Sequence, residues 1–329
     1  MKSFEHVNAT SVDEAIETLE VGKGKAVLIA GGTDLLGIIK DRILPDPPEV
    51  VINIKTIRDL GYIREEPAGL KIGALAKLSD IAESADLLPG YGGLVQAARS
   101  IATPEIRNMG TIGGNLCQQV RCWYYRYPHP LGGRIMCRRK GGSSCPAVKG
   151  DNRYHSIMEG KGCFAVCPSD MAVMLTALGA KLAIVGREGK RTVPVRDFFT
   201  AMGTTLNRDE ILTEIQIPKQ PAQARQTYLK YSLRQPIDFA VVSVASVITR
   251  DQDICLDAAI ALGGVAPTPV RASGAEKTIK GRMADAAIAE TASEAAVKSA
   301  KPLGMNAYKV DITKTLVMRA ILSEEPQIQ

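Results

Sequence analysis

The first hundred residues alternate short apolar runs with helical patterns. Three apolar runs have the length of buried strands, at residues 26–30, 50–54 and 70–72. Ser11 followed by Glu14 forms a capping box, which predicts a helix that runs through Leu19. Further helical patterns cover residues 35–40, 79–85 and 91–98. This order of elements is typical of an α/β region.

The second half of the chain predicts a hairpin, an antiparallel sheet and terminal helices. Ser169 can cap a helix over 170–178, which Gly179 ends. Residues 182–185 and 191–195 alternate in polarity around a Gly-containing turn, which is a hairpin signal. Antiparallel strands are predicted at 228–233, 240–249 and 254–263, and helices at 284–299 and 312–322. A domain boundary is expected in the polar, proline-containing stretch 217–223.

Between the two halves, a segment that runs to about Cys167 has repeated Gly, Pro and Arg and no sustained period. Such a segment predicts a loop that something other than a hydrophobic core holds in place. Six of the chain's seven cysteines fall within it. The first residues have no apolar signal region, so we expect a cytoplasmic protein without a disulfide framework. Clustered thiols in such a protein more often bind metal.

Composition narrows the protein class further. The chain has 329 residues, of which 45% are hydrophobic and 23% charged, which excludes a disordered or collagen-like protein. The longest apolar runs, 171–180 and 240–248, are well short of the ~20 residues of a membrane span.

Positive charge is concentrated in the cysteine segment. Between Arg121 and Lys161 nine Lys and Arg face only two acidic residues, whereas the whole chain has a net charge of +6. A local basic field predicts a local anionic partner and not general nucleic-acid binding.

Four cysteines of this segment can be cluster ligands: Cys122, Cys137, Cys145 and Cys163. Four thiolates bind either a 4Fe–4S cluster or structural zinc, but zinc ligands usually form two close pairs, which this spacing lacks. A cubane with four thiolates carries about two negative charges, which the basic residues would compensate. Two alternatives are free buried thiols and a zinc-stabilised nucleic-acid-binding module. In the second, the aromatic residues of 121–127, interleaved with Arg, would stack bases.

Two glycine turns indicate a phosphate-containing ligand. One is Ala30-Gly31-Gly32-Thr33-Asp34, and the other, about eighty residues later, is Thr111-Ile112-Gly113-Gly114-Asn115. Backbone amides of such turns can hold a phosphate, and two turns suggest a long dinucleotide bound from two sides. The alternative is two tight turns that need glycine for steric reasons alone. Rossmann and P-loop fingerprints are absent from the sequence.

Together with Pro168-Ser169-Asp170, these turns resemble the FAD-binding (medium) subunit of the molybdenum hydroxylases, the family of xanthine dehydrogenase, aldehyde oxidase and carbon monoxide dehydrogenase. The resemblance covers essentially the whole chain. It implies an α+β fold, in which an α/β-type FAD-binding domain of the vanillyl-alcohol-oxidase kind precedes a smaller α+β domain. The implied ranges are 1–57 and 58–220 for the two FAD subdomains and 221–329 for the C-terminal domain.

The resemblance also implies the flavin site. Its residues would be Leu28, Ile29, Ala30, Gly31, Gly32, Thr33, Asp34, Leu35, Ile101, Thr111, Gly114, Asn115, Asp170, Leu206 and Lys230. Ile101 would lie beside the isoalloxazine, where the eukaryotic xanthine enzymes have an aromatic residue. Lys230 near the ring could stabilise an anionic reduced flavin, although an exposed strand lysine is the commoner role.

The cysteine segment resembles an insertion in the corresponding subunits of 4-hydroxybenzoyl-CoA reductase and the periplasmic-type aldehyde oxidoreductases, where it carries a 4Fe–4S cluster. By position its ligands would be the four cysteines named above. Cys167, which stands where relatives commonly have His, is a rival for one ligand position, and Cys117 belongs to the second flavin turn.

The implied activity is electron transfer inside an oxidoreductase complex. Substrate chemistry would take place on a molybdenum-cofactor large subunit. Electrons would pass from 2Fe–2S clusters of a small subunit through FAD to an external acceptor such as NAD, ferredoxin or a quinone. The sequence offers no catalytic acid–base pair and no nucleophile, which fits such a relay.

Overall fold

A small parallel sheet carries the first glycine turn. The computed structural model describes residues 2–322. Strands β1 (Glu5–Asn8), β3 (Val50–Asn53) and β2 (Ala26–Ile29) pair in parallel in the order β1-β3-β2. Helix α1 (Val12–Val21) is capped by Ser11, whose hydroxyl accepts from the Glu14 amide. Helix α2 (Leu35–Lys40) starts directly after the glycine turn.

A five-stranded antiparallel sheet follows. Its order is β4 (Ile63–Glu66), β5 (Gly69–Gly73), β10 (Ile211–Pro218), β6 (Lys181–Gly186) and β7 (Gly189–Pro194). Its helices are α3 (Leu78–Glu83), α4 (Leu88–Arg99), α5 (Pro104–Met109), α6 (Ile112–Cys117) and α8 (Asp170–Ala177). All eight residues of α8 are buried. Beyond β7 come α9 (Val195–Phe198) and the short pair β8 (Phe199–Thr200) and β9 (Gly203–Thr204).

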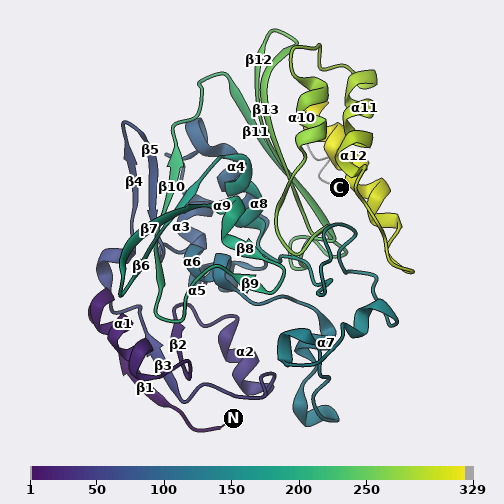
Figure 1. The fold of residues 1–329 in the computed structure, drawn as a ribbon. Helices are drawn as coiled ribbons and strands as arrows, with labels where there is room; N and C mark the ends of the chain where they lie inside the picture. The colour runs from purple at the N-terminus through teal and green to yellow at the C-terminus, as the bar shows by residue number, and fades with distance from the viewer. Residues whose placement is uncertain (1, 323–329) are drawn as a thin grey trace.

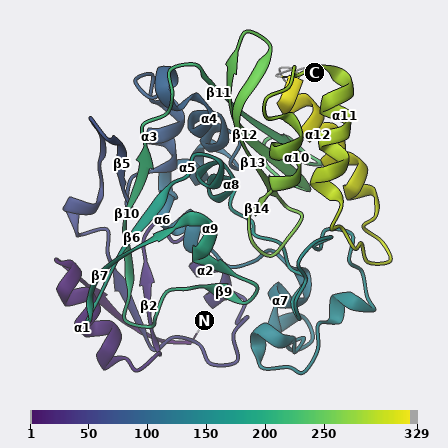
Figure 2. The ribbon, with the colours of Figure 1, turned by 45° about the horizontal axis from the view of Figure 1, so that its top comes forward.

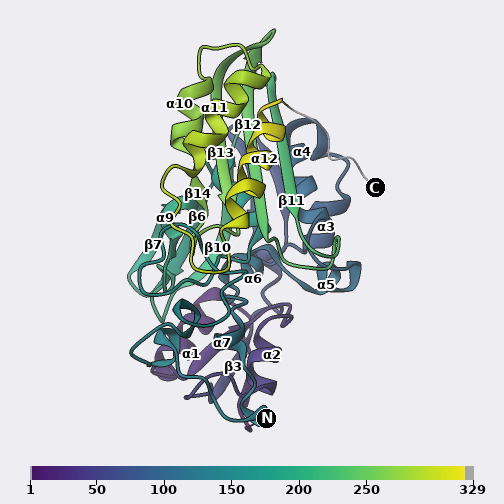
Figure 3. The same ribbon diagram turned by 90° about the vertical axis from the view of Figure 1, so that its right-hand side faces the viewer.

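Helices cover both faces of the third sheet. Its antiparallel strands are β11 (Ala224–Tyr231), β12 (Val242–Asp251), β13 (Ile254–Gly263) and β14 (Val270–Arg271). Helices α10 (Ser273–Ile279), α11 (Ala286–Val297) and α12 (Tyr308–Leu322) cover one face, and α4 and α8 pack on the other (Figure 3). One hydrophobic core therefore runs from the second sheet through α4 and α8 to the third sheet.

The cysteine segment, residues 117–167, lies beside α2 and below the C-terminal helices (Figures 1 and 2). Apart from α7 (Trp123–Arg126), its regular structure is limited to 3₁₀ turns at His129–Leu131, Arg138–Lys140 and Pro146–Val148. A further such turn, Arg58–Leu60, lies between β3 and β4. The prediction of an irregular loop agrees with this arrangement.

The structure confirms the α+β fold class but adds elements that the pattern did not predict. Residues 104–117 hold α5 and α6, and strands β1, β4 and β10 and helix α10 were also missed. Most of these elements are short or lie at glycine-rich turns, where periodicity over a few residues carries little information. The eight-residue β10 has a register shift between Leu212 and Glu214, which interrupts its alternation. Within residues 2–322, no helix has the length and apolar character that crossing a bilayer requires.

Candidate cofactor sites

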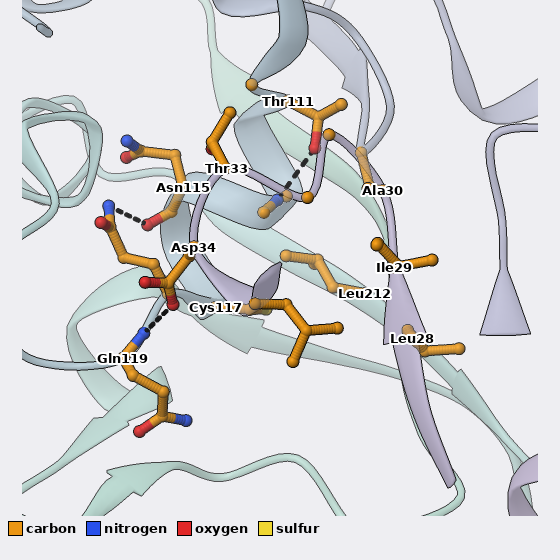
Figure 4. A pocket seen from close by; sticks show the side chains of 18 of the residues that line it. Leu28, Ile29, Ala30, Thr33, Asp34, Thr111, Asn115, Cys117, Gln119 and Leu212 are labelled. Carbon is orange, nitrogen blue, oxygen red and sulfur yellow. Dashed lines mark hydrogen bonds between the residues drawn. The ribbon is translucent and has the colours of Figure 1, made fainter. Parts of the chain in front are cut away.

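A single cavity of about 830 Å³ brings the predicted flavin residues together (Figure 4). All fifteen of them line it, although they come from β2, the turn after it, α2, the α4–α6 region, α8, the loop before β10 and β11. A volume of this size lies within the ordinary range for cofactor pockets. The cavity wall is mainly apolar along Leu28 and Ile29 and polar at Thr33, Asp34 and Asn115 (Figure 4).

Both glycine turns pack closely against backbone. A side chain at Gly31 would come within 2.0 Å of the Met109 carbonyl oxygen, just before the second turn, and one at Gly113 within 2.8 Å of the Ala74 carbonyl oxygen. Gly32 has φ +73°, a conformation that other residues rarely adopt. The steric explanation for these glycines therefore holds, and it is compatible with ligand binding because the packed turns form one continuous cavity wall.

A hydrogen-bond chain ties the second turn to helix α8. The Ala172 amide donates to the Ser169 hydroxyl at 3.0 Å, and that hydroxyl donates to Asn115 Oδ1 at 2.5 Å. Thr111 caps α6 by accepting from the Gly114 amide at 3.1 Å (Figure 4). These contacts explain how motifs about fifty residues apart in the sequence meet at one cavity.

Asp170 and Lys230 form a buried ion pair at the cavity wall. Lys230 Nζ donates to Asp170 Oδ2 at 2.9 Å and to the Ser100 carbonyl at 2.8 Å. Tyr228 donates to the other Asp170 oxygen at 2.6 Å, and burial, followed by the Asp170 charge, raises the pKa of that phenol. The Lys230 side chain is only 7% exposed, so its reading as an ordinary exposed strand lysine is wrong. Its charge is balanced by Asp170 within the protein.

Asp34 bonds to the cysteine segment. Its carboxylate accepts from the Gln119 amide at 2.8 Å and pairs with the guanidinium groups of Arg121 and Arg126. Burial alone would raise the pKa of Asp34, but the two guanidiniums hold it below its usual value. The side chain makes no cap bond to its own helix α2. This role has no signal in the glycine motif itself.

A second, much smaller cavity is lined by all four predicted cluster cysteines: Cys122, Cys137, Cys145 and Cys163. Burial, with a smaller contribution from the neighbouring Cys145 and Cys163 sulfurs, raises the pKa of the Cys122 thiol to about 11. The rival cysteines lie elsewhere. Cys117 lines the large cavity and Cys167 belongs to the core around α8. Within residues 2–322, no group of three or more His, Cys, Asp or Glu side chains is close enough together to hold a single metal ion.

Arg139 lines the cysteine cavity, and Lys140 lies behind its Tyr124–Tyr125 wall. Arg139 Nε donates to Cys163 Sγ at 3.2 Å. Lys140 is only 4% exposed, and its Nζ donates to the carbonyls of Tyr124 and Tyr125. No carboxylate within residues 2–322 pairs with it, and burial lowers its pKa. The sequence showed this positive charge but not that one lysine is buried.

The aromatic residues of the segment pack inward. Trp123 donates to the Asp151 carbonyl at 3.1 Å and stacks edge-on against Tyr154 and His155. His155 Nε2 lies 3.2 Å from Cys122 Sγ, and burial lowers the pKa of this imidazole to about 4. These rings therefore shape the wall around the cysteines, a contact that the sequence spacing did not reveal.

The segment is also bonded to the C-terminal domain. Asn306 Nδ2 donates to the His155 carbonyl at 3.1 Å, and the Met305 amide donates to Asn152 Oδ1 at 2.9 Å. Lys309, which is fully buried, donates to the His155 carbonyl at 3.0 Å. The cysteine segment is thus held at its start by Asp34 of the first glycine turn, and at residues 152–155 by residues 305–309 around the start of α12.

Comparisons with known proteins agree with this geometry. A family described as the FAD binding domain in molybdopterin dehydrogenase matches residues 2–220. The CO dehydrogenase flavoprotein C-terminal domain family matches residues 227–323. The aldehyde oxidoreductase FAD-binding subunit PaoB of Escherichia coli K12 is 30% identical over 336 residues, with 98% of each chain covered. The glyceraldehyde dehydrogenase medium chain of Sulfolobus acidocaldarius is 29% identical, with 96% of each covered.

Solved structures give the same result. A carbon monoxide dehydrogenase of Hydrogenophaga pseudoflava, which lacks the Mo-pyranopterin moiety of its molybdenum cofactor, aligns with a TM-score of 0.79 at 27% identity. The alignment covers 98% of this chain and 96% of that one.

Proposed function

This chain belongs to the FAD-binding (medium) subunits of the molybdenum hydroxylases, which are oxidoreductases, and we propose that it is the electron-transfer subunit of such a complex. Its partners would be a molybdenum-cofactor large subunit, which carries the substrate chemistry, and a small subunit with 2Fe–2S clusters. Electrons would pass through FAD and a 4Fe–4S cluster in this chain to or from NAD, ferredoxin or a quinone. Because thiols stay reduced in the cytoplasm, we assign the complex to that compartment.

One observation carries the proposal. Arg121 lines the large cavity and Cys122 lines the small one, so a single peptide bond connects the two walls. A flavin and a cluster held in these cavities would be neighbours, as an electron relay requires.

FAD fits the large cavity. The two glycine turns line the same cavity and place backbone close to the ligand, and Thr111 keeps a hydroxyl proton free to donate to a phosphate. Asp170 and Lys230 fix the polar wall, while Leu28, Ile29 and Ile101 exclude water from the apolar part. When bound, FAD exchanges one electron with iron–sulfur clusters and two with a nicotinamide.

The charges around the small cavity support an anionic cluster there. A buried ammonium without a carboxylate partner is costly unless another anion lies nearby, and Lys140 has none within residues 2–322. A thiolate-bound cubane with about two negative charges would supply that anion. The bond from Arg139 to Cys163 would stabilise the thiolate form of this sulfur.

The purified chain tests the proposal directly. We expect flavin absorbance together with about four irons per FAD, and a reduced-cubane EPR signal at low temperature. Cys145→Ser should remove the iron and the signal but leave FAD bound. The matched control is Cys255→Ala, because Cys255 is a buried cysteine of the C-terminal domain. Unchanged iron in Cys145→Ser would contradict the ligand set, and a flavin-free chain with salt-dependent nucleic-acid binding would contradict the function.

A further inference from the structure

Helix α2 lines the flavin cavity and packs against residues that line the cysteine cavity. Its first residue, Leu35, and its central residue, Ile38, line the flavin cavity. Ile38 also packs in the apolar cluster that contains Cys137 and Cys163, together with Tyr125 and Val120. A shift of this short helix would therefore move side chains at both sites.

The Asp34 ion-pair cluster, which consists of Asp34, Arg121 and Arg126, adds a polar connection at the start of the same helix. Asp is a preferred N-cap residue, yet Asp34 makes no cap bond to α2. Within residues 2–322, the side-chain bonds of Asp34 go to Gln119, Arg121 and Arg126, which flank Cys122. Arg126 extends the connection by donating to the carbonyls of Gln119 and Val120.

We propose that α2 and the Asp34 ion-pair cluster couple the two sites, so that FAD binding and cluster assembly each strengthen the other. The inference rests on the proposed function, since it needs both cofactors. The physical reason is that ordering residues 119–126 against Asp34 fixes the flavin turn at one end and the cysteine wall at the other. Ligands that each favour the same ordered arrangement bind with positive cooperativity, and this coupling is reciprocal. Asp34 is the positioning residue for it.

A matched control exists in the C-terminal domain. Glu276 accepts from a backbone amide, that of Ile260, at 2.7 Å and from Arg271 at 2.7 Å, as Asp34 accepts from an amide and from arginine. The Glu276 and Asp34 side chains are 14% and 17% exposed. Glu276 lines neither cavity. Glu276→Gln therefore breaks a comparable ion pair without touching either site.

The experiment measures FAD affinity by flavin fluorescence on the full chain, with its iron present and after removal of the iron by an oxidant and a chelator. In the wild type we expect FAD to bind at least about fivefold more tightly when iron is present. Asp34→Asn should bring the ratio close to one, whereas Glu276→Gln should keep the wild-type ratio. In the reciprocal measurement, FAD should increase the iron retained against a fixed chelator concentration in the wild type and not in Asp34→Asn.

A ratio close to one in the wild type, or a wild-type ratio in Asp34→Asn, overturns the coupling. If Asp34→Asn loses its folded circular-dichroism spectrum, Arg126→Gln takes its place, because Arg126 does not line the flavin cavity. A chain that holds both cofactors independently contradicts only the coupling. A chain that never holds flavin or iron contradicts the proposed function as well.

Discussion

The buried pair Lys230–Asp170 offers a direct test of how burial changes the contribution of an ion pair to folding stability. Its N–O distance is 2.9 Å and its side chains are 7% and 6% exposed. The pair Lys25–Glu49 has nearly the same distance, 2.8 Å, but its side chains are 62% and 50% exposed. Lys→Met at each site removes the charge and keeps most of the aliphatic chain. The two variants therefore differ mainly in the burial of the carboxylate that is left behind.

The expected costs differ severalfold. Removing one partner of a buried pair costs about 3–5 kcal/mol, and Lys230→Met also leaves the Ser100 carbonyl without this donor. An exposed pair contributes little, because water screens its charges and both side chains lose conformational freedom. For a chain of this length about 2 °C of melting temperature corresponds to 1 kcal/mol. We therefore expect Lys230→Met to melt about 6–10 °C lower than the wild type, and Lys25→Met to melt close to it.

The assay is thermal unfolding of the flavin-free chain followed by circular dichroism, with hydrogen exchange of the β11 amides as a local readout. The double variant Asp170→Asn with Lys230→Met should recover part of the loss, because no unpaired charge remains. Equal melting temperatures for Lys230→Met and Lys25→Met would refute the argument from burial. Strictly additive losses in the double variant would refute the pairing.

Three further outcomes follow from the site geometry. Because the folded pKa of Asp34 lies below its unfolded value of about 3.9, its ion pairs stabilise the fold fully above that pH and lose this effect as pH falls through the folded pKa. The stability difference between wild type and Asp34→Asn, measured by denaturant titration, should therefore shrink on acidification. A constant difference would exclude a stabilising contribution from the Asp34 ion pairs. Gly31→Ala should lower the free energy of unfolding by about 1–3 kcal/mol, since its Cβ would meet the Met109 carbonyl. Gly90→Ala, whose Cβ would have no atom within 4 Å, should change it little. Equal losses in urea unfolding would contradict this steric argument. Lys140→Met should lower the reduction potential of the proposed cluster, because a buried positive charge favours the added electron, and an unchanged potential in an EPR-monitored titration would argue against it.

The sequence determined the local structure where strong local signals exist. Ser11 and Ser169 cap the helices that they were predicted to cap, and helix 35–40 begins and ends at the predicted residues. The long strands around residues 242–263 also follow from their sustained apolar pattern. In each case the information lies within a few neighbouring residues, so no tertiary contact is needed to read it.

Only the tertiary structure decided which polar groups meet. Asp34 and Arg121 are 87 residues apart, and Asp170 and Lys230 are 60 apart, yet each pair is in contact. Whether Lys140 or Lys230 is exposed depends on what packs over it, because the sequence does not distinguish a surface lysine from a buried one. The composition thus showed a basic, cysteine-rich segment. Chain packing decided that four of its thiols share one cavity, one peptide bond from the glycine-turn cavity.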